Sequence, residues 1–332
     1  MLRMTNRSAH LKRTTLNKDI ELVATRDGFG IGLVELGEKN NQVVVLCGDL
    51  ADSTRAAKFR EKFPRRFIEM GIQEQNMANV AVGLALAGKI PFVSTYAVFT
   101  PGRNWDQIRI SGAYNKANVK YAGAHAGISV GPDGATHQAL EDIALMRVLP
   151  CMTVLVPCDA EETRKVVHVA ASVQGPVYFR FGRTATPAFT TTDTPFNIGK
   201  AQVFRDGSDV AIIGAGPIVH TALAAADRLI EQDISCRVIN NPSVKPLDEE
   251  TIERAARECG AVVTCEEHQC AGGMGSAVAE FLAQTFPVPQ IFIGMRDSFG
   301  ESGQPEELLK KYRMDTDAIV AAVRQIVKKK RR

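Results

Sequence analysis

Short apolar runs rich in β-branched residues alternate with longer amphipathic runs along most of the chain. Continuous apolar strands separated by helices are typical of a parallel sheet that helices cover on both faces. Ligands of such sheets bind beyond the carboxyl ends of the strands, so the segments that follow each strand are the places to search for a site. In the first part of the chain the pattern predicts strands over 42–47, 66–69, 91–95, 119–123, 153–157 and 177–181, and helices over 28–38, 55–62, 74–87, 104–116, 138–147 and 160–173.

The stretch 187–200 is rich in Thr and Pro and interrupts this alternation, so we interpret it as a linker. The sequence therefore predicts an α/β protein with an N-terminal tail (1–19), a first domain (20–190) and a second domain (191–332). A second series of elements follows the linker, with strands over 209–214, 235–240, 261–266 and 290–294 and helices over 218–231, 249–258 and 272–285.

Composition changes this picture little. Hydrophobic residues make up 45% of the 332 positions and charged residues 23%, as in ordinary soluble proteins. No apolar run is long enough to span a bilayer, so no membrane partner is expected, and the N-terminus lacks the apolar core of a secretory signal. The seven cysteines form no CxxC pair, and reduced thiols in a cytoplasmic protein explain them best.

The net charge of +3 comes largely from basic residues at the two ends, such as Arg3, Lys18 and the run 328–332. Basic tails can contact nucleic acid, but solvated, disordered ends are the simpler interpretation. We therefore expect no nucleic-acid partner.

Two glycine clusters stand at predicted strand-to-helix turns. Gly214-Ala-Gly216 lacks the third glycine of a dinucleotide-binding motif, which favours a tight turn. The run 272–275 (GGMG) opens a helix, where its amides could hold an anion. Close helix packing explains this run equally well, so the sequence leaves both interpretations open.

A carboxylate, Glu74, stands in the first turn of an apolar helix. Taken alone, it would complement the helix dipole. Two aromatic residues, Tyr96 and Phe99, follow the strand over 91–95, and taken alone they would be core residues. A functional interpretation of these three residues depends on the loop that follows the strand over 119–123.

The glycine-rich loop after the strand over 119–123 carries His125, Asp133 and His137. Two histidines and an aspartate at the ligand-binding edge of a sheet indicate proton transfer and recognition of hydroxyl groups. Zinc binding is less favoured, because no third imidazole or thiolate lies at ligand spacing nearby.

Three ordered runs resemble a known family. FIEMGIQEQNMANVAVGLALAG (67–88), STYAVF (94–99) and HAGISVGPDGATHQALEDIALMR (125–147) together look like the pyrimidine-binding domain of transketolases. The resemblance extends over residues 20–332. It implies a parallel-sheet domain that binds the pyrimidine of thiamine diphosphate, followed by a transketolase-type C-terminal α/β domain.

The resemblance also implies roles for single residues. Glu74 matches the glutamate that hydrogen-bonds the N1′ atom of the aminopyrimidine. Tyr96 and Phe99 match the aromatic pair that forms the pocket of this ring, with Phe99 stacking on it. His137 matches a position that faces cofactor and substrate, and Asp133 matches one that recognises a substrate hydroxyl.

A second set of residues matches those that hold the phosphate of the sugar: Arg26, Ser53, His125 and Arg183. Arginine suits this task because its planar fork fits phosphate oxygens. The resemblance further places Asp49, in the GDL run, among the cofactor-binding residues, and it makes the catalytic residues Glu74, His125 and His137.

A glutamate at position 74 has a chemical reason. Sharing a proton with N1′ converts the 4′-amino group into an imine, which removes the C2 proton of the thiazolium. A carboxyl shielded from water shares such a proton more readily than an exposed one. The implied activity is transfer of a two-carbon ketol unit from a ketose phosphate to an aldose phosphate, with the cofactor as electron sink.

The same family needs a Gly-Asp-Gly motif and a later Asn, which hold a divalent metal on the diphosphate. The chain has no GDG sequence, and both predicted domains are already assigned. The resemblance therefore implies a split enzyme that is active only with an N-terminal subunit holding Mg²⁺ and the diphosphate, assembled as two copies of each subunit. No metal site is expected in this chain.

Three alternatives stay open: the β subunit of a 2-oxo-acid dehydrogenase, a deoxyxylulose-phosphate synthase-like enzyme, and a non-catalytic homologue. The sequence also departs from the family pattern at two positions. Tyr96 stands where Phe is more usual, so its hydroxyl needs a partner if it is buried. Pro132 precedes Asp133 where Glu is common, which stiffens the loop.

Overall fold

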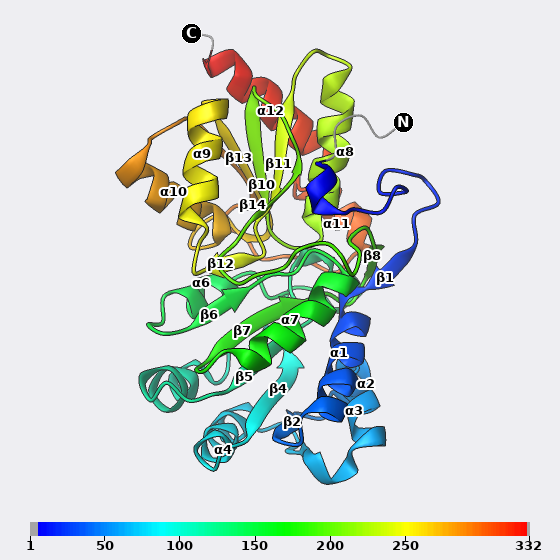
Figure 1. Cartoon of the computed structure of the whole chain (residues 1–332), viewed down its shortest axis with the longest axis vertical. Helices are drawn as coiled ribbons and strands as arrows, with labels where there is room; N and C mark the ends of the chain where they lie inside the picture. Colours follow the sequence, from blue (N-terminus) through cyan, green and yellow to red (C-terminus); the bar gives the residue numbers. More distant parts are fainter. Residues whose placement is uncertain (1–5, 331–332) are drawn as a thin grey trace.

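The computed structural model describes residues 6–330, which form two α/β domains stacked along the long axis of the molecule (Figure 1). The first domain occupies the lower half of the view and the second the upper half, and both ends of the described part, residues 6–9 and α12 (Thr316–Lys330), lie beside the second domain. No helix of residues 6–330 has both the length and the apolar character that crossing a membrane requires.

Seven strands form the sheet of the first domain, in the order β12-β6-β7-β5-β4-β2-β3. Neighbours are parallel except for β12, an edge strand that pairs antiparallel with β6 and follows the linker in sequence. The strands are β2 (Val43–Cys47), β3 (Phe67–Glu69), β4 (Ile90–Tyr96), β5 (Lys120–Ala124), β6 (Thr153–Leu155), β7 (Val177–Phe181) and β12 (Ser243–Lys245).

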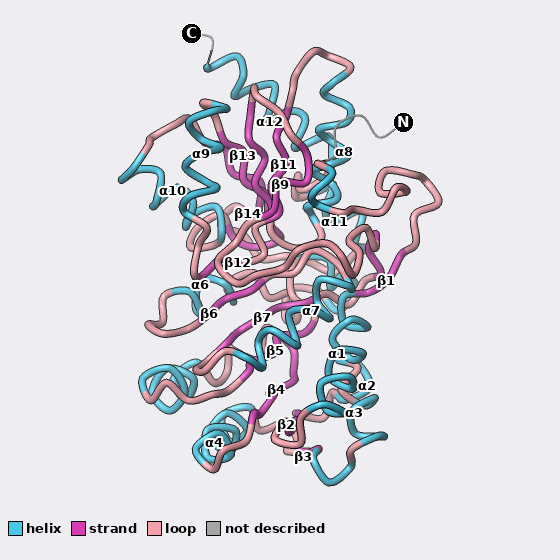
Figure 2. The backbone as a smooth tube through the Cα atoms, viewed as in Figure 1, coloured by secondary structure: helices cyan, strands magenta, loops and turns pink. Residues whose placement is uncertain are grey.

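Side chains alternate between the two faces of this sheet, as the pleat of a strand requires. In β2, Val43 and Val45 pack under one helical layer, whereas Val44 and Leu46 pack under the other. Since both faces are covered, the strand is apolar throughout. Figure 2 shows α1 and α3 on one side of the lower sheet and α4 on the other. One layer contains α1 (Thr25–Lys39), α3 (Ala57–Lys62) and α7 (Ala160–Ser172), and the other contains α4 (Glu74–Leu86), the π-helix η3 (Ile108–Tyr114) and α6 (Asp142–Arg147).

The sheet of the second domain has the order β14-β13-β10-β11-β9, with only β9 antiparallel to its neighbour. Helices α8 and α12 cover one face, and α9 and α10 cover the other. The elements are β9 (Gln202–Arg205), β10 (Val210–Gly214), α8 (Ile218–Ile230), β11 (Cys236–Asn240), α9 (Glu249–Cys259), β13 (Val262–Gln269), α10 (Met274–Thr285), β14 (Gln290–Met295), α11 (Pro305–Lys311) and α12 (Thr316–Lys330).

The predicted α/β class with largely parallel sheets is confirmed. Three predicted helices differ in detail: 55–62 is shortened to α3, 104–116 is α5 (Trp105–Gln107) followed by η3, and 138–147 begins only at Asp142. The prediction missed α11, α12 and several short strands that lie at sheet edges or outside the main sheets. Besides β9 and β12, these strands are β1 (Leu22–Ala24) and β8 (Ala185–Pro187), which pair with each other.

The prediction of disordered ends is wrong for the described residues, although the basic side chains of Lys328 and Lys329 are exposed, as predicted. Lys330 ends α12 and donates to the carbonyl oxygens of Cys259 (2.5 Å) and Asp209 (3.2 Å). At the other end, Nε2 of His220 lies 2.7 Å from the carbonyl oxygen of Thr15, so the predicted tail packs on the second domain. The basic residues Arg3, Arg331 and Arg332 lie outside the described residues.

A buried aspartate fixes the start of the linker. Asp159 caps α7 by accepting from the Glu162 amide (2.9 Å). Its carboxylate also accepts from the amides of Phe189 (2.9 Å) and Thr190 (2.7 Å) and from the Thr190 hydroxyl (2.7 Å). Residues 188–201 contain neither helix nor strand. The Asp159 carboxylate therefore accepts the backbone hydrogen bonds of Phe189 and Thr190 that a neighbouring strand would otherwise accept.

We expect Asp159→Ala to lower the free energy of unfolding by about 3 kcal/mol, because it leaves several buried donors without an acceptor. Urea denaturation followed by circular dichroism measures the change. Asp193→Ala, an exposed aspartate of the same linker, is the matched control and should change stability little. Equal effects of the two substitutions would contradict the assigned role.

Candidate active site

The polar residues singled out from the sequence gather beyond the carboxyl ends of four neighbouring parallel strands, β2, β4, β5 and β7. Ser53 lies in α2 (Ala51–Thr54) after β2, Tyr96 ends β4, His125 follows β5 and Arg183 follows β7. Parallel pairing brings these chain segments to one edge of the sheet, as ligand sites of such sheets require.

Ser53 joins three of these segments. Its carbonyl oxygen accepts a hydrogen bond from Nη1 of Arg26 (2.9 Å) and lies 3.3 Å from Nε2 of His125. Its hydroxyl lies 2.8 Å from the hydroxyl of Tyr96. The Tyr96 side chain is buried, so this contact supplies the partner that the sequence analysis required.

His125 is fully buried and adopts a positive φ of 56°, a conformation that non-glycine residues rarely take. Burial, with the nearby cations Arg26 and Arg183, lowers the pKa of His125 to about 3. The ring is therefore neutral near pH 7. Its Nε2 carries the hydrogen, because the Ser53 carbonyl can only accept, and Nδ1 has no hydrogen-bond partner within residues 6–330.

An aromatic group forms the floor of the site. The rings of Tyr96 and Phe99 stack with centroids 5.7 Å apart and an interplanar angle of 16°. His137 packs edge-on against both rings, at 6.0 Å from Tyr96 and 5.6 Å from Phe99. The Tyr96 ring also lies 4.3 Å from that of His125, so the group joins the Ser53 contacts to His137.

Glu74 begins α4 and is buried. Its Oε1 accepts a hydrogen bond from Nη1 of Arg103 at 3.2 Å, and the guanidinium carbon of Arg103 lies 4.0 Å from the centroid of the Phe99 ring. Arg103 thus connects Glu74 to the aromatic group. Arg103 is not among the residues predicted from the sequence, although its spacing of four residues from Phe99 is the spacing at which side chains meet on a helical turn.

Two further predicted residues pair with each other. Nη1 of Arg183 donates to both carboxylate oxygens of Asp133, at 2.8 Å each. Burial, followed by the repulsion of Arg55, lowers the pKa of Arg26, and Arg183 acts in the same direction. Arg26 and Arg183 thus place positive charge beside the neutral ring of His125, an arrangement suited to binding an anionic group.

Asp49 is a predicted residue that no hydrogen bond or ring contact among residues 6–330 joins to this group. Its amide donates to Oε1 of Glu69 (2.7 Å), and its side chain is exposed in a hollow that it shares with Ser53 and Arg60. Among residues 6–330, no cluster of three or more His, Cys, Asp or Glu side chains is placed to hold a metal ion.

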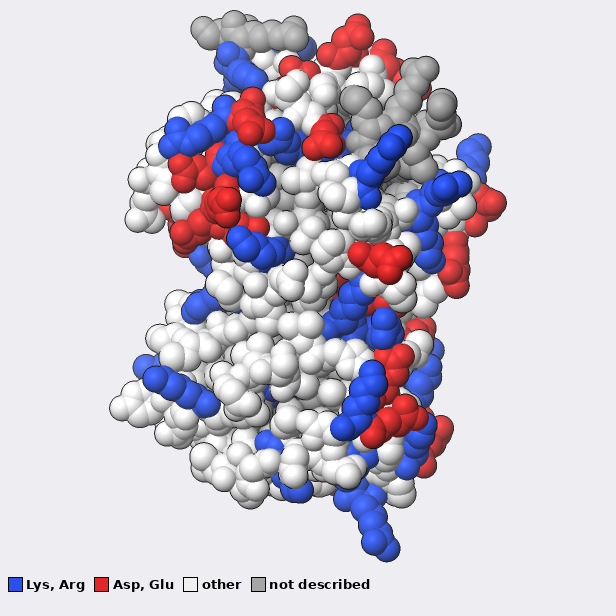
Figure 3. All heavy atoms as spheres, viewed as in Figure 1, with Lys and Arg blue, Asp and Glu red and all other residues white. Residues whose placement is uncertain are grey.

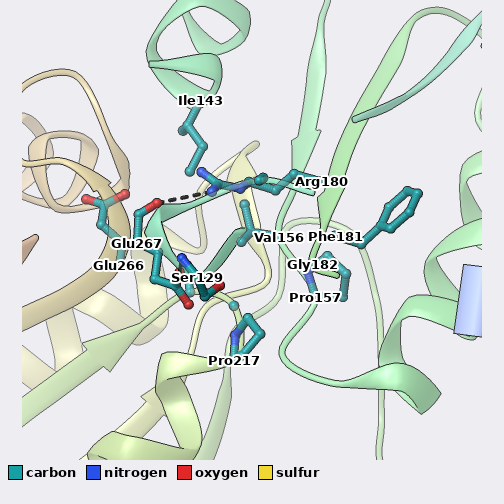
Figure 4. Close-up of a pocket in the computed structure, with 13 residues that line it drawn as sticks. Ser129, Ile143, Val156, Pro157, Arg180, Phe181, Gly182, Pro217, Glu266 and Glu267 are labelled. Carbon is teal, nitrogen blue, oxygen red and sulfur yellow. Dashed lines mark hydrogen bonds between the residues drawn. The ribbon is translucent and has the colours of Figure 1, made fainter. Parts of the chain in front are cut away.

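A separate cavity of about 30 Å³ lies where the two domains meet (Figure 4). Arg180 and Ser129 from the first domain face Glu267 and Pro217 from the second, and Nη2 of Arg180 donates to the carbonyl oxygen of Glu267 at 3.0 Å. The cavity has room for about one or two water molecules, so it is too small for a cofactor or a sugar.

The glycine run 272–275 opens α10 beside this cavity. The amides of Met274 (2.7 Å) and Gly275 (2.8 Å) donate to the carboxylate of Glu266. The helix also packs closely on the sheet, since a Cβ at Gly275 would lie 2.5 Å from the Thr264 hydroxyl oxygen and 2.8 Å from the Phe292 ring. Both interpretations of this run are therefore correct, and the anion that it holds is the chain's own Glu266.

Models of two protein families match the chain: the transketolase pyrimidine binding domain over residues 21–188 and the transketolase C-terminal domain over residues 199–319. The first match alone covers half of the chain. The chain belongs to the transketolase family.

Relatives of similar length support this membership. The 6-deoxy-6-sulfo-D-fructose transketolase subunit SqwH of Clostridium sp. is 39% identical over 92% of this chain and 95% of its own length. An apulose-4-phosphate transketolase subunit of Phocaeicola vulgatus is 38% identical over 93% and 99%. A solved split-gene transketolase, an inactive β4 tetramer, is 48% identical over 92% of this chain and 99% of that chain, with a TM-score of 0.87.

The family resemblance and the fold class predicted from the sequence are thus confirmed. Within this transketolase fold, the described contacts bring Glu74, through Arg103, to the aromatic group and to the cations around His125. The roles of the single residues stay predictions.

We expect His125 to remain neutral from pH 8 down to pH 5, because its pKa of about 3 lies well below that range. Below about pH 6.5 the unfolded chain binds a proton at His125 that the folded chain does not bind. The free energy of unfolding therefore decreases as pH falls from about 6.5 towards 3. Nitrogen NMR of the imidazole resonances, assigned with His125→Asn, measures the protonation. A midpoint near pH 6.5 would contradict the burial argument.

Proposed function

We propose that this chain is the pyrimidine-binding subunit of a thiamine-diphosphate-dependent transketolase that moves a two-carbon ketol unit from a ketose phosphate to an aldose phosphate. One observation carries the proposal: a buried carboxylate, Glu74, accepts a hydrogen bond from a planar nitrogen donor that lies on the face of Phe99. An aminopyrimidine is also a planar nitrogen base, so these residues fit it.

When bound, thiamine diphosphate supplies the electron sink for cleavage of a carbon–carbon bond. This chain contributes the surroundings of the pyrimidine. Glu74 would hold a proton at N1′ of that ring. Phe99 and Tyr96 hold the ring by stacking and keep water away from the carboxylate.

The positive charges of the site indicate which part of the substrate it would contact. Arg26 and Arg183 flank the neutral His125, and they provide planar donors suited to a tetrahedral anion. The relative named for a sulfosugar indicates that a sulfonate is a second candidate for the anionic group. We favour a phosphate, and the two substrates can be compared directly.

The proposed enzyme needs a partner. The described residues offer no metal cluster, so we propose that a second subunit holds Mg²⁺ and the diphosphate, as the subunit names of the relatives suggest. The surface over the lower left of Figure 3 carries few charged side chains, and exposed apolar side chains that gather in one region mark interaction sites. We propose self-association and partner binding there, with two copies of each subunit. Exposed apolar residues of the α4 and η3 region are Ile72, Leu86, Ile110 and Tyr114.

We expect the purified chain alone to show neither thiamine diphosphate binding nor turnover, and the added partner subunit to restore both. Calorimetry measures binding, and a coupled assay for the released aldose phosphate measures turnover. Full activity of the isolated chain would overturn the split-enzyme proposal. Transfer to a lipoyl group instead of an aldose would identify a 2-oxo-acid dehydrogenase subunit, and use of pyruvate as donor would identify a deoxyxylulose-phosphate synthase.

In the assembled enzyme, Glu74→Ala should lower kcat at least about a hundredfold, because it removes the proton partner of N1′. Circular dichroism and the mass of the complex should stay as in the wild type. Glu61→Ala, an exposed glutamate of α3, is the matched control. An active Glu74→Ala complex would refute the assigned role.

We expect Arg183→Ala to raise KM for a phosphorylated ketose about tenfold or more, because a charge-assisted hydrogen bond is lost. KM for the unphosphorylated ketose should change little, and the sulfonated ketose shows whether the site accepts either anion. Arg65→Ala removes an exposed arginine beside α3 and serves as control. Equal losses for charged and uncharged donors would argue against an anion contact at Arg183.

A further inference from the structure

The Arg103 side chain contacts Glu74 and Phe99, the two residues that the proposed function assigns to the aminopyrimidine of the cofactor. It donates to Oε1 of Glu74 at 3.2 Å, and its guanidinium carbon lies 4.0 Å from the centroid of the Phe99 ring. The carboxylate is buried, with 5% of its side chain exposed, whereas the Arg103 side chain is 51% exposed. The guanidinium therefore covers the carboxylate from the solvent side.

A guanidinium and a heterocycle cannot hold this position together. Both are planar, both present N–H groups to a carboxylate, and both lie face to face on an aromatic ring. The rings of Tyr96 and His137 already pack against Phe99, which limits the room for a further planar group there. A pyrimidine that stacks on Phe99 and reaches Glu74 takes the space and the hydrogen-bond acceptor of Arg103.

We propose that Arg103 competes with the cofactor's aminopyrimidine for Glu74 and Phe99, and that cofactor binding displaces this side chain. This inference rests on the proposed function, in which this chain binds the aminopyrimidine ring of thiamine diphosphate. Without the cofactor, Arg103 neutralises a buried carboxylate that is costly to leave unpaired, and this ion pair lowers the apparent affinity for the cofactor.

The surrounding backbone lets the side chain move alone. The Arg103 amide donates to the carbonyl oxygen of Phe99 (2.8 Å). The Asn104 side chain donates to the carbonyl oxygen of Glu74 (3.1 Å) and to the hydroxyl of Thr100 (3.0 Å). These bonds hold the turn in place, so displacement of Arg103 requires only rotation of a half-exposed side chain.

The test is calorimetric titration of thiamine diphosphate, with Mg²⁺, into the complex of this chain and its partner subunit. We expect Arg103→Ala to tighten binding by roughly threefold to tenfold, since one ion pair and one cation–π contact no longer oppose the ring. Arg103→Lys keeps the charge but loses the planar stacking, and its affinity should lie between those of the wild type and Arg103→Ala. Arg254→Ala, an exposed arginine of α9, is the control.

In the Glu74→Gln background the gain from Arg103→Ala should shrink, because the ion pair is already broken. Unchanged or weaker cofactor binding by Arg103→Ala would overturn the competition, and weaker binding would mean that Arg103 helps to hold the ring. Failure of the proposed function looks different: Glu74→Gln would then leave cofactor affinity at the wild-type value. If Glu74→Gln weakens binding and Arg103→Ala does not tighten it, only the competition is wrong.

Discussion

The parallel pairing of β2, β4, β5 and β7 is the constraint on which the candidate site depends. Each strand delivers its carboxyl end to the same edge of the sheet, so residues from separate parts of the chain meet there. The carbonyl oxygen of Ser53 shows the result, since it contacts both Arg26 and His125. A carbonyl oxygen has two lone pairs and can serve both. Without the common strand direction these side chains would lie at opposite edges.

Burial then decides the charge at this edge. His125 is buried beside Arg26 and Arg183, and it stays neutral because a third cation in a dry site is costly. Asp133 pairs with Arg183 and reduces the positive charge. Glu74, buried beyond the aromatic group, takes its counter-charge from Arg103. The site therefore separates a region suited to an anion from a carboxylate suited to a nitrogen base, with the rings of Tyr96 and Phe99 between them.

The sequence predicted the main strands and helices because buried parallel strands are apolar throughout and helices are long and periodic. It missed β1, β8, β9 and β12, most of which mix polar and apolar residues over three or four positions, whereas the equally short β3 and β6 were predicted. It missed the order of the C-terminal end for another reason: Lys328 and Lys330 are exposed, as expected, but the apolar positions of α12, such as Ile319 and Val323, are buried on the second sheet.

The sequence by itself determined the two-domain α/β plan, the family and the ordered motifs around Glu74, Tyr96 and His125, because each depends on residue types and spacing within one segment. Only the tertiary structure decided which partner each side chain takes. Arg103 on Glu74, Asp133 on Arg183 and Glu266 on the α10 amides are contacts whose strength depends on distance and burial. No local pattern encodes those quantities, since they arise when separate segments pack together.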